Sequence, residues 1–213
     1  LVVTPLGATF GFNLPVGGET QTGSPAAMEV IDLNGDGADD VLVAVTGTSS
    51  GGDLDVWLND GSGTLCLDGS YTTGADAFAM TTADFDQDGS SDCAVVLPLL
   101  DKAKVFINDG NGVFSLAATL STGEEPRGIT AFSLGGDVLP DLAVTNYSDD
   151  TLQTWENNTT LAMPVSFSSN GSVGTVIKPK PVKPGSVGGS GGKDESLLVG
   201  GQTEGGAHSA DLL

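Results

Sequence analysis

Short apolar runs separated by polar turns recur along most of this chain. Residues 41–45 and 93–97 are continuous apolar runs rich in valine, and runs of this length suit strands that are buried on both faces. Residues 53–58 and 104–107 each lead to an Asn-Asp-Gly sequence, which is typical of a β-hairpin turn. The pattern therefore predicts an all-β chain of short antiparallel strands.

The order of runs and turns repeats with a period of about fifty residues. Two sets of equivalent positions show this period most clearly. The acidic set is Asp40, Asp92 and Asp141, and the aromatic set is Trp57, Phe106 and Trp155. A single unit of four strands cannot cover both of its apolar faces, so we expect neighbouring units to stack. The aromatic residues would fill the layer between units; an exposed platform for sugars is the alternative.

Three copies are present, and each is predicted to form a propeller-type blade of four antiparallel strands. Copy one spans residues 24–73, copy two 74–122 and copy three 123–174, while residues 1–23 resemble the closing strand of a preceding blade. The predicted strands include residues 27–31, 41–45, 53–58, 64–67, 77–82, 93–97, 104–107, 113–116, 142–144 and 152–155.

An acidic loop follows the first predicted strand of copies one and two. Oxygen-bearing side chains stand at the first, third, fifth and ninth loop positions, which are Asp32, Asn34, Asp36 and Asp40 in copy one and Asp84, Asp86, Asp88 and Asp92 in copy two. A glycine after the fifth position permits a sharp turn, and alternate spacing directs successive carboxylates toward one point. We interpret both loops as Ca²⁺ sites, with a backbone carbonyl of Ala38 or Ser90 as a further ligand.

Copy three keeps the strands and loses most of these ligands. Its loop, residues 133–141, retains only Asp137 and Asp141 from the acidic pattern, and Val138 replaces the turn glycine. We expect no ion here, or a weakly bound one.

The charge of the chain limits its partners. Seven Lys and Arg residues stand against 28 Asp and Glu residues, which gives a formal net charge of -21 and argues against nucleic acid or an anionic membrane surface. The apolar runs are too short to span a bilayer, so no membrane insertion is expected. The chain starts at Leu1 without a visible signal peptide, which is expected of a mature or trimmed product. High acidity and calcium loops favour an extracellular or cell-surface location.

The composition changes after about residue 174. Residues 178–184 alternate lysine with proline and valine, and residues 185–192 are rich in glycine and serine, which indicates an extended tail. Two apolar patches, residues 196–199 and 210–213, are predicted edge strands that dock on a sheet of a neighbouring subunit.

The repeats resemble the FG-GAP/VCBS family, which forms the blades of the integrin α-subunit head. The resemblance is carried by residues 32–45, 56–63 and 83–92 and extends over about residues 9–165. It implies a β-propeller with Ca²⁺ in the loop between the first and second strands of a blade, an extracellular location, and a role in adhesion, assembly or ligand binding. Such propellers usually have about seven blades, so these copies belong to a longer chain or to an array completed by other copies.

Other functions are less well supported by the residues. A lectin that binds glycans between blades remains open, whereas an EF-hand needs flanking helices and a glutamate where Val43 and Val95 stand. An enzyme is not expected, because the sole histidine, His208, lies in the tail and no nucleophile with a partnering base is present.

The remaining candidate features concern modification. Four asparagines fit the N-glycosylation pattern: Asn146, Asn157, Asn158 and Asn170. Cys66 and Cys93 leave two alternatives open, a disulfide or two separate small apolar side chains.

Overall fold

A computed structural model describes residues 23–160 and 165–175, and the backbone alone of residues 198–202 and 208–212. In this part of the chain every regular element is a β-strand. The predicted closing strand at residues 1–23 and the Lys-Pro and Gly-Ser segments of the tail lie outside the described residues, except for Gly23.

The described strands form three four-stranded antiparallel sheets, in each of which the strands follow one another in chain order. Blade 1 contains β1 (Ser24–Ile31), β2 (Asp40–Thr46), β3 (Asp53–Asn59) and β4 (Leu65–Thr72). Blade 2 contains β5 (Ala79–Ala83), β6 (Asp92–Leu97), β7 (Lys102–Asn108) and β8 (Phe114–Ser121). Blade 3 contains β9 (Pro126–Phe132), β10 (Asp141–Asn146), β11 (Thr151–Asn157) and β12 (Phe167–Gly174).

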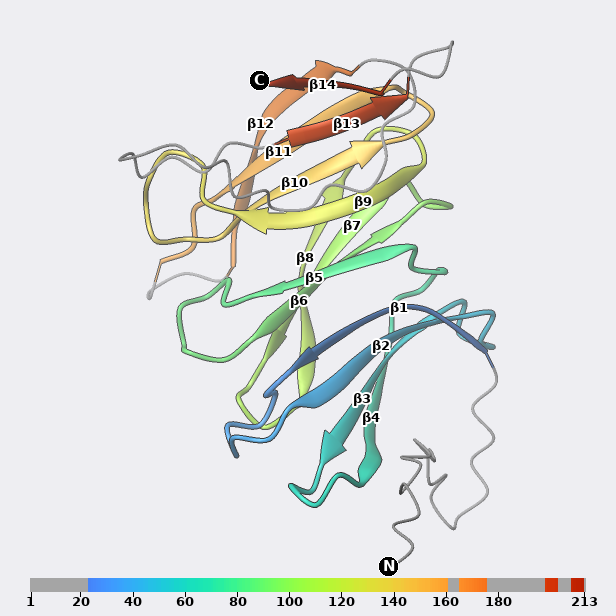
Figure 1. The fold of residues 1–213 in the computed structure, drawn as a ribbon, viewed down its shortest axis with the longest axis vertical. Coiled ribbons are helices and arrows are strands. Elements are labelled where there is room, and N and C mark those ends of the chain that lie inside the picture. The colour runs from blue at the N-terminus through green and yellow to red at the C-terminus, as the bar shows by residue number, and fades with distance from the viewer. Residues whose placement is uncertain (1–22, 161–164, 176–197, 203–207, 213) are drawn as a thin grey trace, which may run out of the picture.

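The three blades are stacked in order, with blade 1 and blade 3 at opposite ends of the molecule (Figure 1). The sheets do not close into a ring within the described residues, so the architecture is an open stack of propeller-type blades. This confirms the predicted fold class.

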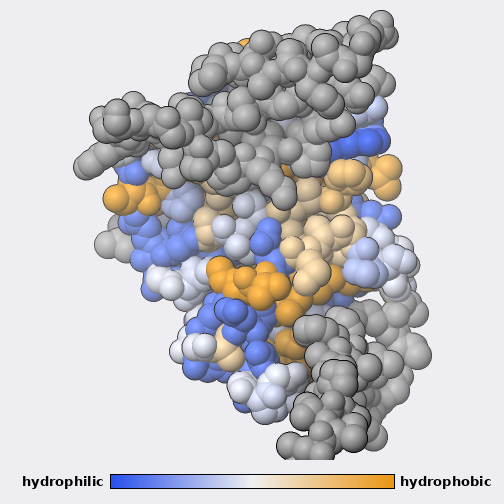
Figure 2. All heavy atoms as spheres, in the orientation of Figure 1, coloured by the Kyte–Doolittle hydropathy of each residue, from blue (hydrophilic) through white to orange (hydrophobic). Residues whose placement is uncertain are grey.

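Two apolar clusters hold the stack together, and Figure 2 shows that some hydrophobic residues also reach the surface near the middle of the described chain, among hydrophilic ones. Alternate residues of β2, such as Leu42 and Ala44, pack against Val95 and Phe106 of blade 2. The opposite face of blade 2, which includes Val96 and Val105, packs in turn against blade 3. Because both faces of the middle sheet are covered, β6 is buried along its whole length, as its continuous apolar sequence predicts.

Each blade also carries an irregularity at the same place. The pairing of the third and fourth strands shifts register beside the aromatic position, between Val56 and Trp57 in blade 1 and between Val105 and Phe106 in blade 2. A bulge of this kind increases the local twist and redirects the side chain that follows it. The described fourth strands extend further than the sequence pattern indicates.

Residues of the two apolar patches of the tail pair with each other, whereas the sequence predicts edge strands added to a larger sheet. β13 (Leu198–Gln202) and β14 (His208–Leu212) form a separate two-stranded antiparallel sheet, which lies at the blade 3 end of the molecule in Figure 1. The ladder places His208, the sole histidine, opposite Gln202.

Candidate metal centre

The two acidic loops connect the first and second strands of blades 1 and 2. Residues 32–39 join β1 to β2, and residues 84–91 join β5 to β6. Strands flank both loops, so the EF-hand interpretation is excluded by the structure.

The second loop brings three carboxylates together. Ligand oxygens of Asp84, Asp86 and Asp88 all lie within 4.8 Å of one another. Backbone N–H groups of the same loop fix them: the N–H of Asp88 donates to Asp84 Oδ1 and to Asp86 Oδ1, both at 3.1 Å, and that of Gly89 donates to Asp84 Oδ2 at 3.0 Å. Gly89 has a φ of 93°, which an L side chain rarely adopts, so the glycine permits this turn.

The electrostatics of this loop favour a bound cation. Partial burial raises the pKa of Asp86 above its usual value, and the charges of Asp88 and Asp84 add to the effect. A divalent cation would remove the repulsion among the three carboxylates, and hard oxygen donors match the preference of Ca²⁺. The residues present therefore fit Ca²⁺.

The first loop has the same turn with one carboxylate fewer. Asp32 accepts hydrogen bonds from the N–H groups of Gly35 at 2.8 Å and Gly37 at 2.9 Å, and the bond from Gly37 contributes most to lowering its pKa. Asn34 Nδ2 donates to Asp36 Oδ2 at 3.1 Å, and the N–H of Asp36 donates back to Asn34 Oδ1 at 3.0 Å. An amide in place of the middle carboxylate makes this site less negative than the second one.

The predicted backbone ligands occupy equivalent places in the two loops. The N–H of Ala38 donates to Asp36 Oδ1 at 2.8 Å, and the N–H of Ser90 donates to Asp88 Oδ1 at 2.7 Å. These bonds hold the fifth and seventh positions of each loop together.

The aspartates at the ninth position are placed differently from the other candidate ligands. Asp40 and Asp92 are fully buried, and both oxygens of each accept backbone N–H groups. In blade 2 these donors are Phe85, at 2.7 Å, and Asn108, at 2.9 Å. Each carboxylate thus braces its loop against the end of the third strand. Burial raises the pKa of Asp92 to about 7, with a further contribution from the charges of Asp86 and Asp88.

The third loop has the buried aspartate that bonds it to the third strand, but it lacks the cluster of carboxylates. Asp141 is fully buried and accepts from the N–H groups of Leu134 and Asn157, and burial raises its pKa. Asp137, which is exposed, accepts a hydrogen bond at its carbonyl from Ser133 Oγ at 3.1 Å. The first and third loop positions carry no carboxylate, in keeping with the expected weak or absent site.

Asparagines at the ends of the third strands connect neighbouring loops, a role that the sequence reasoning missed. Asn108 Nδ2 donates to the carbonyl of Leu33 in the loop of blade 1 at 2.8 Å, and Asn157 Nδ2 donates to the carbonyl of Phe85 in the loop of blade 2 at 2.9 Å. Both side chains are buried. Asn59, Asn108 and Asn157 stand 49 residues apart in the sequence, and this regular spacing could have indicated their shared role.

Two of the three repeated aromatic residues fill the layers between blades, as predicted. Phe106 and Trp155 are almost fully buried in the two inter-blade clusters, which leaves neither as an exposed sugar platform. Trp57 occupies the equivalent position on the outer face of blade 1, where it lines a pocket.

The candidate modification sites differ in accessibility. Asn146 and Asn157 are buried and their side-chain nitrogens donate hydrogen bonds within the chain, so a glycan on either is incompatible with this packing. Asn158 and Asn170 are exposed. Cys66 is an exposed free thiol and Cys93 a buried one, so the disulfide alternative is not adopted.

These features define a class of protein, the repeat proteins built from β-propeller-type blades. Residues 32–95, which carry both acidic loops, match a family model described as an FG-GAP-like repeat, and this match confirms the predicted resemblance for that segment. No curated protein matches the chain at a significant level. In the described part of the chain, no helix is long and apolar enough to cross a membrane.

Two solved structures share the fold at low sequence identity. The first is the crystal structure of BBS1N in complex with ARL6DN, soaked with lead, with a TM-score of 0.57, 16% identity, and coverage of 85% of this chain and 48% of the other. The second is a functionally unknown protein from Desulfotomaculum acetoxidans DSM 771, with a TM-score of 0.58, 12% identity, and coverage of 87% and 54%. The chain thus spans about half the length of each of these two structures.

Proposed function

We propose that this chain is a non-catalytic Ca²⁺-binding repeat protein that acts outside the cell or at its surface, in adhesion or self-assembly. The observation that supports the proposal best is the convergence of Asp84, Asp86 and Asp88 within 4.8 Å in a loop closed by its own backbone N–H groups. The second loop is the stronger site, and the first loop binds the same ion with one carboxylate fewer.

The role of the ion is to stabilise the loops and the inner strands that they join. Extracellular modules bind Ca²⁺ with a Kd of roughly 10⁻⁴–10⁻³ M. At a tenfold excess of Ca²⁺ over Kd, each occupied site adds about 1.4 kcal/mol to the free energy of unfolding. For a domain of this size, 1 kcal/mol corresponds to roughly 2–4 °C in Tm. Two sites would therefore raise the Tm by about 6–11 °C.

A partner for the blades is supported by the open stack and by the tail. Blade 1 and blade 3 end the stack without a further described blade on their outer sides, and the chain continues from β12 into a tail that carries four of its seven cations. The body is strongly acidic, so a basic tail segment is complementary to the body of another copy. We infer that copies of this chain, or another surface protein, are the partners.

Calorimetric titration of Ca²⁺, with thermal unfolding in Ca²⁺ and in excess chelator, tests the ion-binding part. Asp86→Asn should weaken binding and reduce the Ca²⁺-dependent gain in Tm, whereas Asp68→Asn, at an exposed position of β4, should change neither. An unchanged unfolding curve in chelator would exclude a stabilising ion. Deletion of residues 175–213 tests the assembly part: the blades should stay folded while higher-order assembly is lost.

A further inference from the structure

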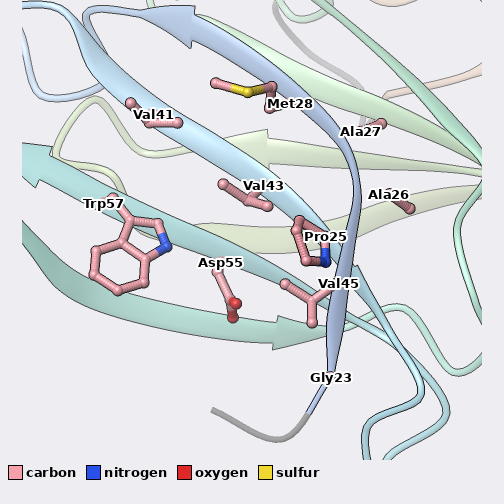
Figure 3. A pocket seen from close by; sticks show the side chains of 10 residues that line it. All are labelled: Gly23, Pro25, Ala26, Ala27, Met28, Val41, Val43, Val45, Asp55 and Trp57. Carbon is pink, nitrogen blue, oxygen red and sulfur yellow. The ribbon is translucent and has the colours of Figure 1, made fainter. Parts of the chain in front are cut away.

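An apolar groove lies on the outer face of blade 1. It has a volume of about 420 Å³, and its lining includes Pro25, Met28, Val41, Val43, Asp55 and Trp57. Figure 3 shows these side chains projecting from β1, β2 and β3 on one side of the sheet, with the Asp55 carboxylate between Trp57 and Val45. We call this pocket the blade 1 groove.

The groove lies on the face of blade 1 that corresponds to the stacking faces of blades 2 and 3. The three faces differ in the side chain at one equivalent position. Asp55 pairs with Val43 across the ladder, Lys104 pairs with Val95, and Gln153 pairs with Val144, so the three are equivalent. Lys104 Nζ donates to the carbonyl of Thr73 in blade 1 at 2.7 Å, and Gln153 Nε2 donates to the carbonyl of Ser121 in blade 2 at 3.3 Å.

Blade 1 therefore has an acceptor where stacked blades have a donor. If another blade stacked on this face, the backbone carbonyl at the end of its fourth strand would face the Asp55 carboxylate instead of an N–H donor. Asp55 is fully buried, accepts a hydrogen bond from Ser70, and has a pKa raised by burial. A carboxylate among apolar walls favours an occupant that brings apolar surface together with a cationic side chain.

The basic residues of the described blades already have partners within the chain. Lys102 Nζ donates to Ser121 Oγ at 2.9 Å, Lys104 to Thr73, and Arg127 pairs with Glu125. The other four cations are Lys178, Lys180, Lys183 and Lys193. Three of them alternate with Pro, Val and Ile within residues 176–184, a composition that matches the groove in both apolar surface and charge.

Within one chain, the first two lysines of this segment are too close to blade 3 to reach the blade 1 groove. Thr175 is held at blade 3 by the hydrogen bond from its N–H to the carbonyl of Asp150, at 2.7 Å. Lys180 follows five residues later and Lys183 eight residues later, and extended chains of these lengths span at most roughly 18 Å and 29 Å. The blade 1 groove lies beyond two sheet-to-sheet spacings of about 10 Å each, on the far side of the stack. A neighbouring molecule has no such restriction.

We propose that the blade 1 groove binds the Lys-Pro segment, residues 176–184, of a second copy of this chain, with a lysine of the segment directed toward the buried Asp55 carboxylate. The proposal rests on the assembly role given above and names the surface through which assembly occurs. Proline-rich segments dock in aromatic-lined grooves at low cost in conformational entropy, and Trp57 provides that aromatic wall. Because each copy has a groove at one end and a segment at the other, the contact is head to tail and propagates.

Sedimentation velocity of the full chain in Ca²⁺ tests the proposal. Asp55→Asn, and separately the triple change Lys178→Gln, Lys180→Gln and Lys183→Gln, should each weaken self-association by at least about tenfold. Asp68→Asn, which changes the charge by the same amount as Asp55→Asn, and Lys193→Gln, which removes one cation of the tail outside the segment, should leave it unchanged. A 1:1 mixture of the Asp55→Asn and triple-lysine variants should form dimers and no longer species, because each pair retains one intact groove and one intact segment.

The other outcomes are distinct. Association that needs the tail but ignores both changes would overturn this contact while leaving the proposed function. If Val43→Asp abolishes association while Asp55→Asn leaves it unchanged, the occupant of the groove is apolar, such as a blade of another copy. This result would also overturn the proposed contact. A parent chain that stays monomeric would overturn this contact and the self-assembly role, whereas Ca²⁺ binding is decided separately by the titration described above.

Discussion

Replacement of Asn108, which lies between blades 1 and 2, is expected to destabilise the stack much more than replacement of Asn59, the equivalent residue of blade 1. Asn108 is fully buried, and its Nδ2 donates to the carbonyls of Leu33 at 2.8 Å and Ser91 at 3.2 Å. Its Oδ1 accepts from the N–H groups of Gly110 at 3.2 Å and Gly112 at 3.0 Å. The Leu33 bond is the one that joins two blades.

Asn59, the equivalent residue of blade 1, makes a smaller set of bonds. Its Nδ2 donates to the carbonyl of Asp39 at 3.0 Å, and its Oδ1 accepts from the N–H of Gly61 at 3.1 Å. A hydrogen bond contributes about 1 kcal/mol net, and leaving a buried partner unsatisfied costs more. We therefore expect Asn108→Ala to cost about 3–4 kcal/mol and Asn59→Ala about 1–2 kcal/mol.

The assay is thermal unfolding followed by circular dichroism, with urea unfolding as a second measurement. A difference of about 2 kcal/mol between the two variants corresponds to roughly 4–8 °C in Tm. Asn157→Ala should resemble Asn108→Ala, because Asn157 makes the same contact with Phe85 of blade 2. Equal effects of Asn59→Ala and Asn108→Ala would refute the reasoning, since the bond between blades would then contribute nothing measurable.

The remaining predictions concern Ca²⁺, charge, pH and thiol reactivity. Excess chelator should lower the Tm by about 6–11 °C if both sites are occupied, as worked out above. Asp55→Asn should leave the Tm of the unassembled chain unchanged or raise it, because it removes a buried charge whose pKa is raised by burial. In chelator, stability should fall as the pH rises from about 4 to 7, since the folded state holds a proton on Asp92, with a pKa of about 7, that the unfolded state has released; a Tm that rises over this interval would contradict the assignment. A thiol reagent should modify Cys66 in the folded chain and spare Cys93, which is buried and whose pKa is raised by burial; modification of both at equal rates would contradict the packing.

The sequence by itself determined the strands, the repeat and the turns. Alternation and short valine-rich runs predict strands because burial on a pleated sheet repeats every two residues, and Asn-Asp-Gly sequences predict the hairpins that join them. The convergence of Asp84, Asp86 and Asp88 was also predictable, because their alternate spacing and the following glycine constrain a short loop to one conformation. These are local properties, which a chain carries in its order of residues.

Only the tertiary structure decided how the copies differ from one another. Asp40 and Asp92 continue the pattern of candidate metal ligands in the sequence. The blade geometry buries both fully and bonds each to an N–H group of the third strand, whereas Asp32 and Asp84 stay partly exposed in their loops. Asn108 looks like a turn residue, and the stacking of blades places its amide beside Leu33. Trp57 and Phe106 occupy the same register, yet one lines an outer groove and the other lies between sheets. Such outcomes depend on which neighbour packs against a face, and contacts between residues far apart in the chain are set by packing that a repeat pattern does not encode.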